Sequence, residues 1–108
     1  MFQKNLNIIL IPNYLLNLSA NAIDDLQTVY AYCYNISHSY CNRIKNNFYS
    51  KFSFISYNPY AFQKFQSKSR KFQNCRRCIC SKFVIIYRIY NEYVEVLNVF
   101  HSRSNYHL

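Results

Sequence analysis

The stretch FVIIYRIYNEYVEVLNVF, residues 83–100, decides the fold of this chain. It contains two runs rich in β-branched and aromatic residues, Phe83–Tyr90 and Tyr93–Phe100, and such residues favour β-strands. Asn91 and Glu92 stand between the runs and suit a tight turn, because Asn tolerates the positive φ that such a turn requires. The stretch therefore predicts a β-hairpin.

A shorter β-like run, Arg76–Ser81, precedes the hairpin. Within it Cys78 and Cys80 alternate with Ile79, and successive side chains of a strand point to opposite faces. We therefore expect both thiols on one face, as small core residues. The run predicts a third strand.

A helix is predicted upstream, from Ala20 to about Tyr34, because Ser19 is a favoured N-cap residue. The apolar face of this helix is predicted to comprise Ile23, Leu26, Tyr30 and Cys33. Residues 35–39 are polar and predict the turn that follows it.

A second helix is indicated by apolar residues at helical spacing, namely Tyr40, Ile44, Phe48, Phe52 and Ile55. Asn58-Pro59 should end it, because the residue before a proline is driven out of the α region. Two helices joined by a short connection predict an antiparallel helical hairpin.

A short apolar run, Tyr14–Leu18, precedes the first helix and completes the element order β-α-α-β-β-β. This order predicts an α+β fold of two layers, a helical hairpin packed on a mainly antiparallel sheet, with Phe62–Cys75 as a basic loop. A chain of 108 residues has room for one domain, which we assign to residues 14–108. Residues 1–13 are an apolar-rich lead-in, interpreted either as an extra strand at residues 7–11 or as a start placed too early.

The chain is strongly basic, with a formal net charge of +9 from thirteen Lys and Arg against four Asp and Glu. Such a charge favours polyanionic partners: nucleic acid, the ribosome or an acidic polypeptide. No apolar run approaches the roughly 18 to 20 residues that cross a bilayer, and no secretory cleavage site is present. We expect a cytoplasmic protein without a membrane partner.

Five cysteines are an odd number and argue against a disulfide framework. A zinc site could be drawn from Cys75, Cys78 and Cys80 together with Cys33, His38 and Cys41. Zinc sites of this kind commonly use two C-x2-C pairs, and no second clean pair is present. We therefore expect no metal and no cofactor.

Four weak patterns follow one another along the chain. They are Leu18-Ser19 with Ala22, Asp25-Leu26, Val29 and Tyr32; Tyr57-Asn58-Pro59-Tyr60; the stretch RRCICSKFVIIYRI, residues 76–89; and VEVLNVFH, residues 94–101. In this order and at these distances they resemble the RelE/ParE toxins of type II toxin–antitoxin systems, over roughly residues 14 to 106. The resemblance implies a RelE-like fold and a toxin that inhibits growth, with a cognate antitoxin as partner.

The resemblance implies two alternative activities. RelE-like toxins cleave mRNA on the ribosome without a metal, which requires proton-transfer groups and cations that stabilise the phosphorane. The catalytic candidates for this are His101, Arg76, Arg88, Arg103 and Tyr106, with Arg77 and His107 in the same inventory. ParE-like toxins instead inhibit DNA gyrase through surface contacts and are not enzymes. A third interpretation is a degenerate, non-toxic protein that keeps the fold and binds the antitoxin.

Two features leave the choice open. Arg88 is also suited to pairing with Glu95 or Glu92 across the hairpin. The family's last strand ends in His-x-x-Arg, whereas this chain has Ser104 where the arginine is expected and Arg103 one residue earlier. On a strand such a shift turns a side chain to the other face, but beyond the strand Arg103 could still reach the same place.

Overall fold

The computed structural model describes residues 13–104. The lead-in at residues 1–12, with its alternative interpretations, and the candidates Tyr106 and His107 lie outside these residues. The elements in chain order are β1 (Leu15–Leu18), α2 (Ala20–Ile36), α3 (His38–Tyr57), the short 3-10 helix η1 (Arg70–Phe72), β2 (Cys75–Cys80), β3 (Phe83–Ile89) and β4 (Tyr93–His101).

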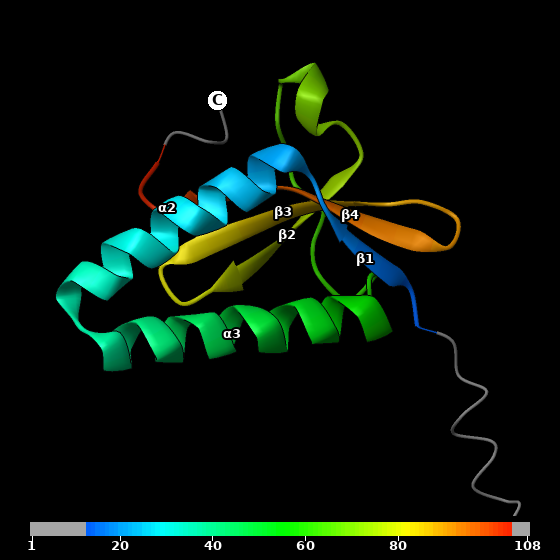
Figure 1. Ribbon diagram of the computed structural model, residues 1–108. Helices are drawn as coiled ribbons and strands as arrows, with labels where there is room; N and C mark the ends of the chain where they lie inside the picture. The colour runs from blue at the N-terminus through cyan, green and yellow to red at the C-terminus, as the bar shows by residue number, and fades with distance from the viewer. Residues whose placement is uncertain (1–12, 105–108) are drawn as a thin grey trace, which may run out of the picture.

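The four strands form one sheet in the order β1-β4-β3-β2. Strand β1 runs parallel to β4, while β2, β3 and β4 pair antiparallel, so the sheet is mixed but mainly antiparallel. Helices α2 and α3 form a hairpin that covers one face of this sheet (Figure 1). The predicted α+β fold with the order β-α-α-β-β-β is confirmed.

The two helices are longer than predicted, and only Ser37 separates them. The N–H of Ser37 donates to the carbonyl of Cys33, and its side chain accepts from the N–H of Tyr40 at 3.0 Å. One serine thus caps the end of α2 and the start of α3, which makes the predicted turn at 35–39 wrong at both edges. Neither helix combines the length and the hydrophobicity needed to cross a membrane.

The buried face of α2 is rotated relative to the prediction. Its buried residues are Ala22, Leu26, Val29 and Cys33, whereas Ile23 is 43% exposed. Polar contacts with β4 explain the rotation. Ser19 donates to the carbonyl of Leu97 at 2.8 Å, and Asp25 accepts from the N–H of Val99 at 2.8 Å. The predicted face of α3 is confirmed at its fully buried positions, Ile44, Phe48 and Ile55.

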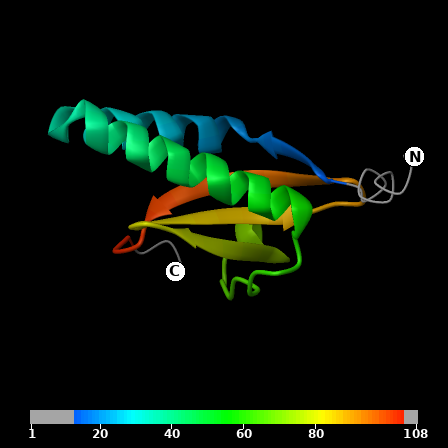
Figure 2. The same cartoon turned by 90° about the horizontal axis from the view of Figure 1, so that it is seen from below.

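The face of the sheet that the helices leave open is covered in part by the loop between α3 and β2 (Figure 2). This loop was predicted to be merely basic, yet it buries Phe65 and Phe72. These rings pack with Cys75, Val84 and Ile86 in a second core cluster. Burial on both faces explains why the hairpin strands are apolar throughout rather than alternating.

The turns are formed without glycine, which the chain lacks. Among the described residues only Asn74 (φ 59°) and Ser81 (φ 56°) have a positive φ. Asn91 does not, so the conformation predicted for it is wrong, although residues 91 and 92 do lie between the strands. The turn is closed instead by the N–H of Tyr90 donating to the carbonyl of Tyr93 at 2.8 Å. The two tyrosine rings stack at 4.5 Å between centroids.

Candidate functional site

Arg76 lies near the start of β2, where its guanidinium holds the segment that leaves α3. Its Nη1 donates to the carbonyl of Phe62 at 2.7 Å and to that of Tyr60 at 3.4 Å. The guanidinium carbon lies 5.2 Å from the centroid of the Tyr60 ring, a distance typical of a cation–π contact. Arg76 therefore has a structural role at this end of the sheet.

Arg88 has a comparable role on the other face. Its Nη2 donates to the carbonyls of Lys71 and Gln73, at 2.9 Å each, which fixes the loop around η1. Glu95 is its partner across the hairpin, but the two are linked only indirectly. Arg88 donates to the Tyr90 hydroxyl, which donates to Glu95, both at 3.4 Å. The hydrogen bond with Tyr90 is the main cause that raises the pKa of Arg88 above its ordinary value.

His101 is the last residue of β4 and is exposed. Its ring meets that of Phe83 edge-on at 5.6 Å, and its Nδ1 accepts from the N–H of Arg103 at 3.1 Å. The N–H of Ser104 donates to the carbonyl of His101 at 2.9 Å, so Arg103 and Ser104 lie in a turn beyond the strand. The alternation of a strand consequently does not apply to Arg103.

The candidates do not converge. Arg76 is paired with Tyr87, while His101 is paired with Phe83, four residues away along β3. At about 3.3 Å per residue this separates the two pairs by roughly 13 Å along the sheet. Arg88 is paired with Cys75, on the face opposite to Arg76. Of the catalytic candidates within residues 13–104, only His101 and Arg103 lie next to each other.

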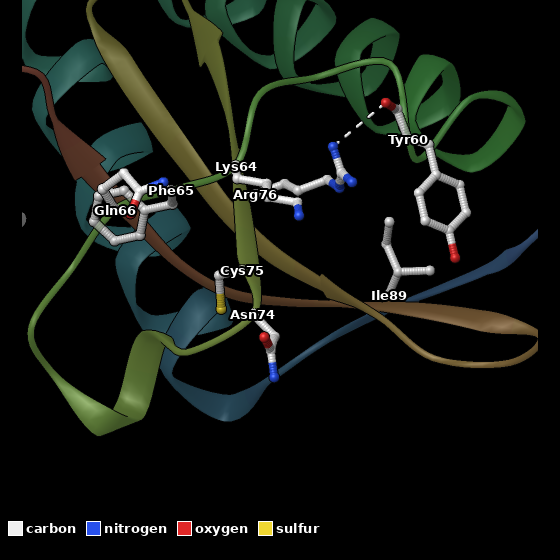
Figure 3. Close-up of a pocket in the computed structure, with 8 residues that line it drawn as sticks. All are labelled: Tyr60, Lys64, Phe65, Gln66, Asn74, Cys75, Arg76 and Ile89. Atoms are coloured by element: carbon white, nitrogen blue, oxygen red, sulfur yellow. Dashed lines mark hydrogen bonds between the residues drawn. The ribbon is translucent and has the colours of Figure 1, made fainter.

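Two hollows accompany these residues. One of about 490 Å³ lies beside α2 and is lined by residues that include Tyr32, His101 and Ser104. The other, of about 330 Å³, lies where β2 begins and is lined by Tyr60, Lys64, Phe65, Gln66, Asn74, Cys75, Arg76 and Ile89 (Figure 3). The second hollow was not predicted from the sequence. The basic residues of the loop at 62–75 could have indicated it, because Lys64 of this loop is among the residues that line it.

The five cysteines are free and buried. Cys78 and Cys80 share one buried face of the sheet, as predicted, and this is the side that the helices cover, while Cys75 lies on the other side. Burial raises the pKa of both Cys78 and Cys80 to about 11, which suppresses the thiolate form that binds metals. Within residues 13–104 no three His, Cys, Asp or Glu side chains are grouped so that they could hold a metal ion.

Solved toxin structures share this fold. The chain is similar to a chromosomal ParDE toxin–antitoxin system from P. aeruginosa, with a TM-score of 0.66 and 13% identity, over 82% of this chain and 95% of that one. It is similar to the toxin–antitoxin complex RelBE2 from Mycobacterium tuberculosis, with a TM-score of 0.54 and 18% identity over 84% and 93% of the two chains. It is also similar to a mutant of the E. coli toxin RelE in the free state, with a TM-score of 0.55 and 11% identity, over 86% of this chain and 87% of that one.

The sequence itself carries the family assignment. No curated protein matches it significantly. A family model described as the ParE toxin of the type II toxin–antitoxin system parDE, however, matches residues 16–106, which is most of the chain. The chain therefore belongs to the ParE toxin family of type II toxin–antitoxin systems.

Proposed function

We propose that this toxin inhibits growth without catalysis, by binding DNA gyrase, as the ParE branch of the superfamily implies. The observation that carries the proposal is that Arg76 and Arg88 hold other segments of this chain in place. Each guanidinium donates to backbone carbonyls of the chain itself. A ribonuclease of the RelE kind would need these cations gathered around one reacting phosphate, whereas Arg76 and Arg88 lie on opposite faces of the sheet.

The placement of His101 also supports gyrase binding over RNA cleavage. A general base or acid acts within hydrogen-bond reach of the reacting group, with the stabilising cations around the same phosphate. His101 and Arg76 are too far apart along the sheet to share one phosphate. A surface that binds a protein target has no such requirement.

A cognate antitoxin is the proposed partner that keeps the toxin inactive. The similar ParDE and RelBE2 structures are those of a toxin–antitoxin system and a toxin–antitoxin complex. The net charge of +9 favours an acidic antitoxin segment, because charge complementarity speeds encounter. Exposed aromatic residues on the helices, including Tyr32 at 60% and Tyr49 at 79%, offer apolar area for it. Both gyrase and antitoxin would be met in the cytoplasm, where we place the activity.

Two assays with the same purified protein test the target. We expect inhibition of supercoiling by gyrase at micromolar or lower toxin, relieved by stoichiometric antitoxin. We expect no cuts in a defined message on translating ribosomes. Cuts confined to the ribosomal A site, with normal supercoiling, would overturn the proposal in favour of RNA cleavage.

Expression without the antitoxin tests toxicity itself. We expect growth arrest on induction and normal growth when the antitoxin is co-expressed. Normal growth while soluble, folded toxin accumulates would contradict a toxic function and favour the degenerate interpretation.

A further inference from the structure

Two positive side chains oppose each other beside the hollow where β2 begins. Lys64 and Arg76 are partners in an antiparallel bridge. Like charges directly opposite across such a pair destabilise it. Neither side chain forms an ion pair within residues 13–104 that would offset the repulsion, and the residues that line the hollow include no Asp or Glu.

The guanidinium of Arg76 is positioned by contacts within the chain and still has donors to spare. Arginine has five N–H donors, and among the described residues only Nη1 of Arg76 is engaged. The Tyr60 ring lies against the guanidinium, 5.2 Å from its central carbon. In Figure 3 the side chains of Lys64 and Arg76 both extend toward Tyr60 and Ile89. The hollow thus presents two adjacent positive groups, one of them preorganised.

We propose that this hollow binds a phosphate group, held by Lys64 and Arg76. A phosphate accepts several hydrogen bonds at once, which suits the fork of an arginine beside the ammonium of a lysine. Tyr60 is 62% exposed, so its ring also offers a stacking surface to a base attached to that phosphate. The phosphate would belong to a free nucleotide or to a nucleic-acid backbone. The site is independent of the gyrase proposal, because it requires neither that target nor the antitoxin.

Titration of the isotope-labelled toxin in chloride buffer tests the site by NMR. The probes are inorganic phosphate, adenosine monophosphate, a short DNA oligonucleotide and an acidic peptide without phosphate. We expect saturable shifts at the Nε–H of Arg76 and at the amides of Lys64, Gln66 and Asn74. Equal affinity for the mononucleotide and the oligonucleotide identifies a free nucleotide as the source, and binding of the oligonucleotide alone identifies a nucleic-acid backbone. Shifts with the acidic peptide alone, or with no probe, overturn the proposal.

A pair of loop lysines gives a matched test. Lys64 is exposed, so Lys64→Gln should leave the fold intact and weaken phosphate binding by about tenfold. Lys68→Gln removes the same charge from an exposed position of the loop that does not line the hollow, and should change affinity by less than about twofold. Added phosphate should also raise the Tm of the natural protein more than that of Lys64→Gln. Equal weakening by both substitutions would show diffuse charge attraction and overturn the site.

Discussion

The hydroxyl of Tyr87 donates a hydrogen bond to the carbonyl of Pro59 at 2.6 Å, across 28 residues of sequence. Tyr87 is fully buried at the centre of β3, and Pro59 is buried just beyond the end of α3. Burial raises the pKa of Tyr87 above its ordinary value, so the phenol stays a proton donor further into the alkaline range. One hydrogen bond therefore connects the middle of the sheet to the exit of the helical hairpin.

Tyr87→Phe should lower the free energy of unfolding by about 1–3 kcal/mol, because the buried carbonyl of Pro59 loses its partner. Urea denaturation followed by circular dichroism measures the change. Tyr49→Phe removes the same hydroxyl from a side chain that is 79% exposed and should cost less than about 0.5 kcal/mol. Equal effects of the two substitutions would show that the buried hydrogen bond contributes nothing particular.

Asp25→Ala should destabilise the protein by about 1–3 kcal/mol. The carboxylate of Asp25 accepts from the N–H of Val99 at 2.8 Å and from the side-chain amide of Asn98 at 3.0 Å. Its loss leaves a buried backbone donor unpaired. The neighbouring Asp24 is exposed, and its side chain makes none of these contacts, so Asp24→Ala is the control in the same denaturation experiment. An equal loss of stability in the two variants would contradict the proposed link between α2 and β4.

Ser37→Ala should cost about 1 kcal/mol, since one side chain caps α3 at the only residue between the helices. Ser50→Ala, at an exposed position within α3, should be neutral or slightly stabilising, because alanine has the higher helix propensity. Urea denaturation measures the change, as a shift of the midpoint of unfolding while the slope of the transition stays the same. A neutral Ser37→Ala would mean that the turn is held by packing alone.

The strands and helices were readable from the sequence because their patterns are local. Phe83–Tyr90 was predicted as a strand, and β3 ends only one residue earlier, at Ile89. The rotation of α2 was not readable, because it depends on Ser19 and Asp25 reaching a strand more than seventy residues away. Hydrophobic spacing alone therefore predicted, wrongly, that Ile23 lies on the buried face of α2.

The roles of the candidate residues were less predictable than their identities. Arg76 and Arg88 were recognisable as charges on apolar strands. Which carbonyls they reach depends on the path of the loop at 62–75, which no local pattern specifies. The loop that contains Lys64 was predicted only to be basic, and the bridge that places Lys64 opposite Arg76 is a tertiary contact.

Buried thiols should make stability fall at alkaline pH. Burial raises the pKa of Cys78 and Cys80 from 9.0 to about 11. The unfolded chain therefore loses these protons first as the pH rises. Their contribution is complete below about pH 9 and is lost as the pH rises through the folded-state values. Urea midpoints between pH 8 and pH 11 measure the fall. The double variant Cys78→Ala, Cys80→Ala should be less stable at neutral pH, and its stability should fall less steeply as the pH rises. An equally steep fall in the variant would show that other groups cause the loss of stability.

His101→Ala should leave growth inhibition unchanged within about twofold, because the proposed gyrase inhibition needs no proton transfer. A catalytic histidine would instead contribute on the order of a hundredfold or more to the rate of RNA cleavage. The fold should tolerate the substitution, since His101 is exposed and its Nδ1 accepts only from the N–H of Arg103 in the turn beyond β4. Supercoiling inhibition by the variant and the natural toxin, at equal concentrations and with equal circular dichroism spectra, measures the effect. Loss of toxicity together with loss of ribosome-dependent cleavage would make His101 a catalytic residue and place this chain with the RNA-cleaving toxins.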